Sequence, residues 1–281
     1  MQNIIRMPFK WLLKLFKSTY LDDSMDSVLN DEQGIELYNQ LSQLLGKTGM
    51  HARKWLSNSR VVLQSIPEED RASEVHIDER NLPLVKTLGV LWQADNDIFT
   101  FKTNPPDVNF KFTKRNFLSK IATLFDPLGF IAPFTIRAKV LLQEMWTSGI
   151  DWDDSLNEIL VNKSREWFRE LEELCCLKIT RCLQLDEDII STTIHTFVDA
   201  SHEAHGSVVY ARHVNKNGLA SARLISAKSR GAPLTSVSIP RLELMAAVLR
   251  LRLALSVRQA LEVFEKHLVL RSDSMNVVHL S

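Results

Sequence analysis

The chain has 281 residues, a length typical of about two domains. Its 34 Lys and Arg residues balance its 34 Asp and Glu residues, 45% of the residues are hydrophobic, and Gly and Pro number nine each. This composition is typical of folded proteins and excludes a collagen, a Pro- or Gly-rich linker and a largely disordered chain. No apolar run approaches the roughly 18 residues that a membrane-spanning helix requires, so we expect no stable membrane span.

Residues 1–18 combine basic and apolar residues at helical spacing. Arg6, Lys10, Lys14 and Lys17 recur three or four positions apart, with apolar residues between them. This pattern is typical of a basic amphipathic helix, which could lie on a membrane surface or direct the chain to an organelle. The alternative that we favour is a segment packed against the residues that follow.

The residue pattern between positions 31 and 102 predicts one helix and three short strands. Leu and Ile recur at helical spacing over 31–46, where Gly46 and Gly49 end the pattern. Short apolar runs predict strands over 60–66, 87–92 and 98–102, and a turn at 95–97 precedes the last one.

Three helices are predicted between residues 113 and 175, which together indicate a small helical bundle. They span about 114–125, with Thr113 as the N-terminal cap, then 134–148 and 155–174. The start of this region is locally basic and could contact a phosphate backbone, although a solvated helix face explains the same charges equally well. The candidate nucleic-acid-binding residues are Lys111, Lys114, Arg115 and Lys120.

Three cysteines, Cys175, Cys176 and Cys182, lie close together after the predicted bundle. Their odd number and the adjacent pair argue against a disulfide framework and favour a reducing cytosol. We expect these thiols to fill the core, as free cysteines commonly do.

The C-terminal third changes to a β-β-β-α-β order. Strands are predicted over 193–199, 206–214 and 219–228, a long helix over 240–264, and a further strand over 267–272. An Asn-Gly pair at 217–218 predicts the hairpin turn between the second and third strands. His202 and His205 do not have a zinc-protease spacing, so we expect a turn there.

Three carboxylates occupy the ends of these elements. Asp199 ends the first strand, Glu243 lies in the first turn of the long helix, and Asp273 ends the last strand. Carboxylates in such places converge on one end of a sheet and provide the hard oxygen ligands that Mg²⁺ prefers. Each acid alone also has an ordinary explanation as a turn residue or as a partner of the helix dipole.

Four segments carry a resemblance to a known family: FVDAS (197–201), GSVVYAR (206–212), IPRLELMAA (239–247) and LRSDS (270–274). They resemble the ribonuclease H domain of BEL/Pao-type retrotransposon Pol polyproteins, a region grouped as the Pao retrotransposon peptidase family. The resemblance implies that Asp199, Glu243 and Asp273 bind Mg²⁺ or Mn²⁺ and hydrolyse the RNA strand of an RNA–DNA hybrid. It also implies a cytoplasmic or nuclear location and the rest of a Pol polyprotein as a partner.

The resemblance extends upstream. Residues 112–146 look like the thumb side of the same polyproteins, and TYLDDS (19–24) is similar to the YxDD turn of reverse transcriptases, with Tyr20, Asp22 and Asp23 at the matching positions. The implied fold is a multidomain α+β and α/β arrangement that ends in an incomplete ribonuclease H-like mixed sheet with a helix. Its expected parts are an N-terminal segment (1–18), a partial reverse transcriptase palm (19–110), a helical thumb and connection (111–185) and a truncated ribonuclease H-like domain (190–281).

Departures from the family pattern limit the expected activities. No acidic residue precedes Tyr20, so the polymerase metal site is incomplete and we expect no polymerase activity from Asp22 and Asp23, which we interpret as vestigial. The sequence contains no Asp-Thr-Gly or Asp-Ser-Gly triplet, so we find no aspartic protease site. Two hypotheses remain: a ribonuclease H-type nuclease, or an inactive relic or co-opted fragment that binds nucleic acid or protein.

Overall fold

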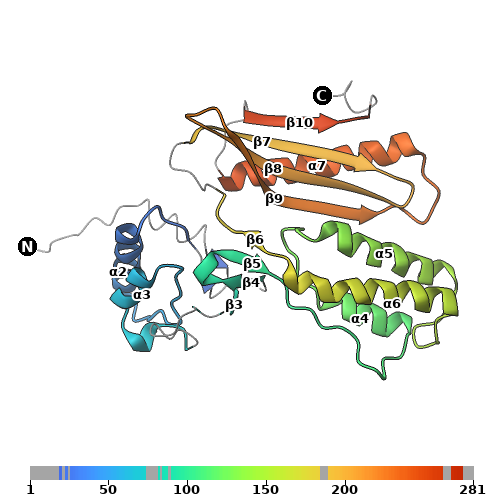
Figure 1. The fold of residues 1–281 in the computed structure, drawn as a ribbon, viewed down its shortest axis with the longest axis horizontal. Coiled ribbons are helices and arrows are strands. Elements are labelled where there is room, and N and C mark those ends of the chain that lie inside the picture. Colours follow the sequence, from blue (N-terminus) through green and yellow to red (C-terminus); the bar gives the residue numbers. More distant parts are fainter. Residues whose placement is uncertain are drawn as a thin grey trace, which may run out of the picture. The chain divides into compact units, whose positions relative to one another are not determined.

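The computed structural model of the chain describes residues 19–20, 23–24, 26–73, 82, 84–87, 90–183, 189–261 and 267–274. The chain divides into two units, Met1–Asp97 and Ile98–Ser281, and each combines helices with strands in an α+β fold, as expected (Figure 1). The amphipathic pattern predicted over 1–18 lies outside the described residues. Among the residues that are described, no helix has the length and hydropathy needed to cross a membrane.

The first unit begins with a short antiparallel pair, β1 (Thr19–Tyr20) and β2 (Asp23–Ser24), in which Tyr20 lies opposite Asp23. The helix predicted over 31–46 is confirmed as α2 (Asp31–Lys47), where the Asn30 side chain accepts a hydrogen bond of 3.0 Å from the Gln33 amide. β3 (Leu84–Thr87) pairs antiparallel with β4 (Val90–Gln93), so the single strand predicted over 87–92 is divided between two strands. The unit also contains two 3₁₀ turns, Glu68–Asp70 and Ala94–Asn96.

The strand predicted over 60–66 is wrong, because these residues form a short helix, α3 (Arg60–Ser65). The Ser59 hydroxyl caps it by accepting a hydrogen bond of 3.3 Å from the Val62 amide. Val62 packs with Tyr38 in one buried cluster, and Leu63 is fully buried in another. The N-terminal cap and packing on two sides therefore override the β-preference of the Val-Val sequence.

In the second unit, the three predicted helices are confirmed and surround one aromatic core. The core includes Phe117, Trp167 and Phe168, whose rings contact one another edge to face. Thr113 caps the first helix, and its hydroxyl accepts a hydrogen bond of 3.2 Å from the Asn116 amide. The helices are α4 (Lys114–Ala122), α5 (Ala132–Thr147) and α6 (Glu158–Glu173).

Two short strands of this unit, β5 (Ile98–Thr100) and β6 (Ile179–Thr180), pair antiparallel beside the helices. A 3₁₀ turn, Leu174–Cys176, links α6 to β6. Cys175 and Cys176 are exposed in this turn, with 3.9 Å between their sulfur atoms, and Cys182 is half-buried. The prediction that these thiols fill the core is therefore wrong for the adjacent pair, because the chain leaves the bundle at this point.

The predicted β-β-β-α-β order is confirmed in the rest of the unit. The four strands form one sheet in the order β10-β7-β8-β9, in which β10 is parallel to β7 and the other neighbours are antiparallel. α7 covers one face of the sheet and buries Ile194, Val209 and Ala211 with Val257 of its own (Figure 1). The elements are β7 (Ile189–Ala200), β8 (Ala204–Asn215), β9 (Ala220–Gly231), α7 (Ile239–Leu261) and β10 (Leu268–Ser272).

The loop before α5 joins the helices to the edge of this sheet. The Leu128 carbonyl accepts hydrogen bonds from the Ala227 amide (2.8 Å) and the Ser226 hydroxyl (2.7 Å) of β9. Further along α5, the Gln143 side chain donates a hydrogen bond of 2.8 Å to the Ala232 carbonyl. The bond from the Ala227 amide pairs one of the main-chain groups on the outer edge of β9, which would otherwise be exposed without a partner. The other two bonds strengthen the attachment of α5 and its preceding loop to this edge.

Candidate functional site

The three predicted carboxylates line one pocket at the end of the sheet. Asp199 is the next-to-last residue of β7, and Asp273 directly follows β10. Glu243 is the fifth residue of α7, so it begins the second turn rather than lying in the first turn as predicted. The pocket is completed by Val198, Ala200, Ala246, Ser272 and Ser274.

Strand direction explains why these residues meet. β7 and β10 are parallel, with Ser272 opposite Val198, so both strands end at the same edge of the sheet. The chain also returns to this edge after β9, where the Ala232 amide donates a hydrogen bond of 2.7 Å to the Glu203 carbonyl. α7 therefore begins close to the ends of both strands and brings Glu243 to the same pocket.

A buried hydroxyl orients one of the carboxylates. Ser274 is 7% exposed, and its hydroxyl donates a hydrogen bond of 2.6 Å to Oε2 of Glu243. The Ser274 amide in turn donates to the Ser272 hydroxyl at 3.1 Å, which fixes the turn around Asp273. Asp199 is exposed and accepts a hydrogen bond of 2.7 Å from the neighbouring Ala200 amide.

The donor set has the chemistry that Mg²⁺ or Mn²⁺ requires, because carboxylate and hydroxyl oxygens are hard ligands. Within the described ranges, however, no three His, Cys, Asp or Glu side chains lie close enough together to hold one ion. The three carboxylates thus share a pocket without already forming a closed ligand set.

The residues predicted to bind nucleic acid do not form one exposed basic surface. Lys114 is buried, its ammonium donates to the Ile150 carbonyl, and it lies 4.9 Å from the centroid of the Trp146 ring and 5.8 Å from that of Trp152. Two neighbouring aromatic rings and a carbonyl therefore contact this cation, which stabilises it inside the protein.

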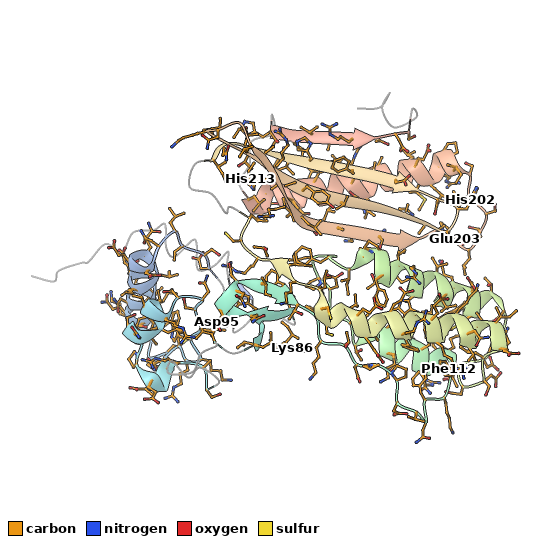
Figure 2. All side chains as sticks on the ribbon, in the orientation of Figure 1. Lys86, Asp95, Phe112, His202, Glu203 and His213 are labelled. Atoms are coloured by element: carbon orange, nitrogen blue, oxygen red, sulfur yellow. The ribbon has the colours of Figure 1, made fainter. Side chains whose placement is uncertain are left out.

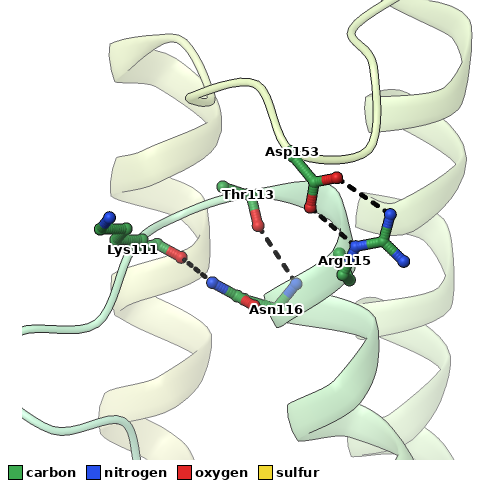
Figure 3. A network of polar contacts seen from close by, with 5 residues as sticks. All are labelled: Lys111, Thr113, Arg115, Asn116 and Asp153. Atoms are coloured by element: carbon green, nitrogen blue, oxygen red, sulfur yellow. Dashed lines mark hydrogen bonds and ion pairs between the residues drawn. The ribbon is translucent and has the colours of Figure 1, made fainter.

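Arg115 forms two hydrogen bonds to Asp153, of 2.7 and 2.9 Å, at the start of α4 (Figure 3). This pair raises the pKa of Arg115 and lowers that of Asp153. Lys111 is exposed and Lys120 donates to the Pro105 carbonyl at 3.2 Å. The function assigned to these residues stays a prediction, and Lys111 and Arg115 are the two exposed residues among the four.

The remaining described residues that the sequence singled out, in the YxDD-like turn and near His202, lie in turns or strands of the fold. Tyr20 and Asp23 lie opposite each other in the antiparallel pair of β1 and β2, and Asp22 lies outside the described residues. His202 and Glu203 lie in the exposed turn between β7 and β8, as expected (Figure 2), whereas His205, which was expected in the same turn, belongs to strand β8. His205 is buried at the start of β8, where burial and then Arg230 lower its pKa.

Comparison with known proteins places these elements in a family. The Pao retrotransposon-like RNaseH-like domain matches residues 113–274, from the cap of α4 to the pocket residue Ser274. No curated protein sequence matches the chain.

Two solved structures of foamy viral proteins show a distant similarity. The foamy viral protease-reverse transcriptase dRH in complex with double-stranded DNA has a TM-score of 0.34 and 13% identity over 70% of this chain and 32% of that one. The foamy viral protease-reverse transcriptase in complex with double-stranded DNA has a TM-score of 0.30 and 14% identity over 59% of this chain and 34% of that one. The chain thus spans about a third of the length of these structures.

Proposed function

Because the family model matches residues 113–274, more than half of this chain, the chain belongs to the Pao retrotransposon-like RNaseH-like domain family, and we propose that the chain is a ribonuclease H-type nuclease acting on an RNA–DNA hybrid. Family membership confirms the resemblance to retrotransposon Pol that the sequence motifs indicate. The substrate, the metal and any role in reverse transcription belong to the proposal, together with the rest of a Pol protein as a partner.

In this proposal, Asp199, Glu243 and Asp273 provide the ligands for Mg²⁺ or Mn²⁺. A divalent ion held there would supply the chemistry that activates a water molecule and stabilises the leaving oxygen in phosphodiester hydrolysis. The hydroxyl of Ser274 holds Glu243 in place, and the side chains of Asp199 and Asp273 are exposed to solvent. The observation that carries the proposal is the pocket shared by three carboxylates from three separate elements.

A second candidate function is nucleic-acid binding without hydrolysis. It is favoured by the spacing of the carboxylates, because no three acidic, His or Cys side chains in the described part of the chain are close enough to hold one ion. Under this alternative, the chain still binds nucleic acid and no longer hydrolyses it.

Cleavage of a hybrid with 5′-labelled RNA by the purified chain, with Mg²⁺ or Mn²⁺, distinguishes the two. The nuclease proposal predicts metal-dependent cleavage that disappears in Asp199→Asn and Asp273→Asn. Glu203→Gln is the matched control, because this carboxylate lies in the exposed turn at the same edge of the sheet and does not line the pocket. A folded chain that binds the hybrid without cutting it favours the second candidate.

A further inference from the structure

Cys175 and Cys176 form an exposed pair of thiols, which we call the dithiol. Their sulfur atoms are 3.9 Å apart, in the 3₁₀ turn Leu174–Cys176 that follows α6. Successive side chains of a 3₁₀ helix point about 120° apart, so neighbouring residues in such a turn do not meet by default. The contact between the two sulfur atoms is therefore a specific feature of this turn.

Hydrogen bonds from two elements hold the dithiol in place. The Cys175 thiol donates a hydrogen bond of 3.1 Å to the Glu172 carbonyl of α6. The Leu177 amide closes the turn by donating to the Leu174 carbonyl at 3.1 Å. From the neighbouring strand β5, the Thr100 hydroxyl donates to the Cys175 carbonyl at 3.4 Å. The main chain around the two thiols is thus fixed both by the helix and by a strand distant in sequence.

The separation of the sulfur atoms matches that of two ligands on one tetrahedral metal ion. Zn²⁺ binds thiolate sulfur at about 2.3 Å in tetrahedral geometry, which places two sulfur ligands about 3.8 Å apart. The 3.9 Å found in the dithiol needs almost no adjustment. Thiolate is a soft ligand that selects Zn²⁺, whereas Mg²⁺ prefers oxygen. The dithiol therefore has the spacing and the chemistry of a two-sulfur ligand for a soft divalent cation.

A disulfide between the two cysteines is the competing use of the pair. Their peptide bond is trans, so their Cα atoms are about 3.8 Å apart, less than the roughly 4.4–6.8 Å of ordinary disulfides. The hydrogen bond with Cys176, followed by burial, raises the pKa of Cys175, which disfavours the free thiolate that oxidation requires. A metal ion displaces the thiol protons itself as it binds, and it requires no strained ring.

The surroundings of the dithiol favour a cation. Glu172 and Glu173 are exposed directly before it, and Lys178 is the one basic residue in the run 172–178. α6 has no basic residue in its last turn, so no side chain there offsets the negative end of the helix dipole. The acidic pair and the helix end therefore both attract positive charge to this turn.

We propose that the dithiol is a binding site for a soft divalent cation such as Zn²⁺, held by the Sγ atoms of Cys175 and Cys176. Binding replaces two S–H bonds with two S–Zn bonds and releases two protons, without any change of oxidation state. Within the described residues, no third His, Cys, Asp or Glu is close enough to join the pair, so the other positions on the ion are left to water or another small ligand. This site does not share residues with the carboxylate pocket.

Co²⁺ is the spectroscopic probe of the site, used with the full chain in a phosphine reductant that keeps the thiols reduced. Thiolate ligands of Co²⁺ give a charge-transfer band in the near ultraviolet, which the oxygen ligands of the carboxylate pocket do not give. We expect this band in the wild-type chain, its loss on adding Zn²⁺ and its persistence in excess Mg²⁺. Competition with a chromogenic zinc indicator then measures the Zn²⁺ affinity. Cys175→Ser and Cys176→Ser should each lower it at least about tenfold, because each removes one of two thiolates.

Cys182→Ser is the matched control, because Cys182 is the third thiol of the chain, is half-buried and lies outside the exposed turn. Zn²⁺ binding that is weakened in both variants of the dithiol and retained in the control supports the proposal. A folded wild-type chain without the band in excess Co²⁺ overturns it, as do equal Zn²⁺ affinities in all three variants. Because the band reports thiolate ligands alone, this result is independent of whether the chain cleaves a hybrid.

Discussion

Gly129 lies directly against the main-chain carbonyl of Ala227, so closely that a Cβ atom on Gly129 would be 1.8 Å from that oxygen. Gly129 also has a φ of +76°, a left-handed conformation that side chains disfavour. Its loop joins α5 to the edge strand β9 through the two hydrogen bonds accepted by Leu128. This close approach attaches the helices to the sheet, and both lie within the residues that the family matches.

Gly129→Ala is expected to destabilise the chain by about 3–5 kcal/mol, because it combines backbone strain with a contact that separates the loop from β9. Gly218→Ala is the matched control. Gly218 has nearly the same φ of +77°, and no atom lies within 4 Å of the place that a Cβ atom on it would occupy, so only strain of about 1 kcal/mol is expected. Equilibrium urea unfolding measures both, and equal losses in the two variants would contradict the close-contact explanation.

Local patterns predicted most of the fold. Thr113 capped the expected helix, and alternation of polar and apolar residues located the strands around Asp199. The order of the elements was enough to bring Asp199, Glu243 and Asp273 to one pocket, because parallel strands end at the same edge. These features depend on neighbouring residues or on topology, which the sequence contains.

Features that depend on distant contacts could not be predicted in the same way. The helix over Arg60–Ser65 is stabilised by packing against residues such as Tyr38. Lys114 is buried, and its ammonium contacts Trp146 and Trp152, which are distant in sequence.

Lys114→Met should reduce stability without removing a phosphate contact. The substitution preserves the length of the side chain, removes the cation that lies beside the two indole rings and leaves the Ile150 carbonyl without its donor. A loss of about 1–3 kcal/mol is expected in urea unfolding. Lys111→Met, at an exposed position, should change stability by less than about 0.5 kcal/mol. A loss of hybrid affinity in folded Lys114→Met would instead support a nucleic-acid contact at Lys114.

Ser274→Ala should weaken metal binding, because Glu243 loses the hydroxyl that orients it at 2.6 Å. Loss of such an orienting group typically lowers metal affinity by about 10–100-fold. Titration calorimetry with Mn²⁺ measures the effect, and Ser274→Thr should restore most of the affinity by returning a hydroxyl. Ser164→Ala removes an equally buried hydroxyl, which donates to Leu160 in α6, and serves as the stability control. If Ser164→Ala weakens Mn²⁺ binding as strongly, the orienting role of Ser274 is wrong.

Two buried histidines should make the chain less stable in mild acid. Burial is the main cause that lowers the pKa of both His205 and His213 from the ordinary value of 6.5. As the pH falls below 6.5, the unfolded chain binds protons at these residues while the folded chain does not, so the free energy of unfolding decreases. Urea midpoints at pH 7.5 and 5.5 measure the decrease, which should be smaller in His205→Gln and His213→Gln than in the wild-type chain. The comparison uses the difference between the two pH values within each variant, so any loss of packing cancels. An undiminished difference in both variants would show that other groups cause the acid sensitivity.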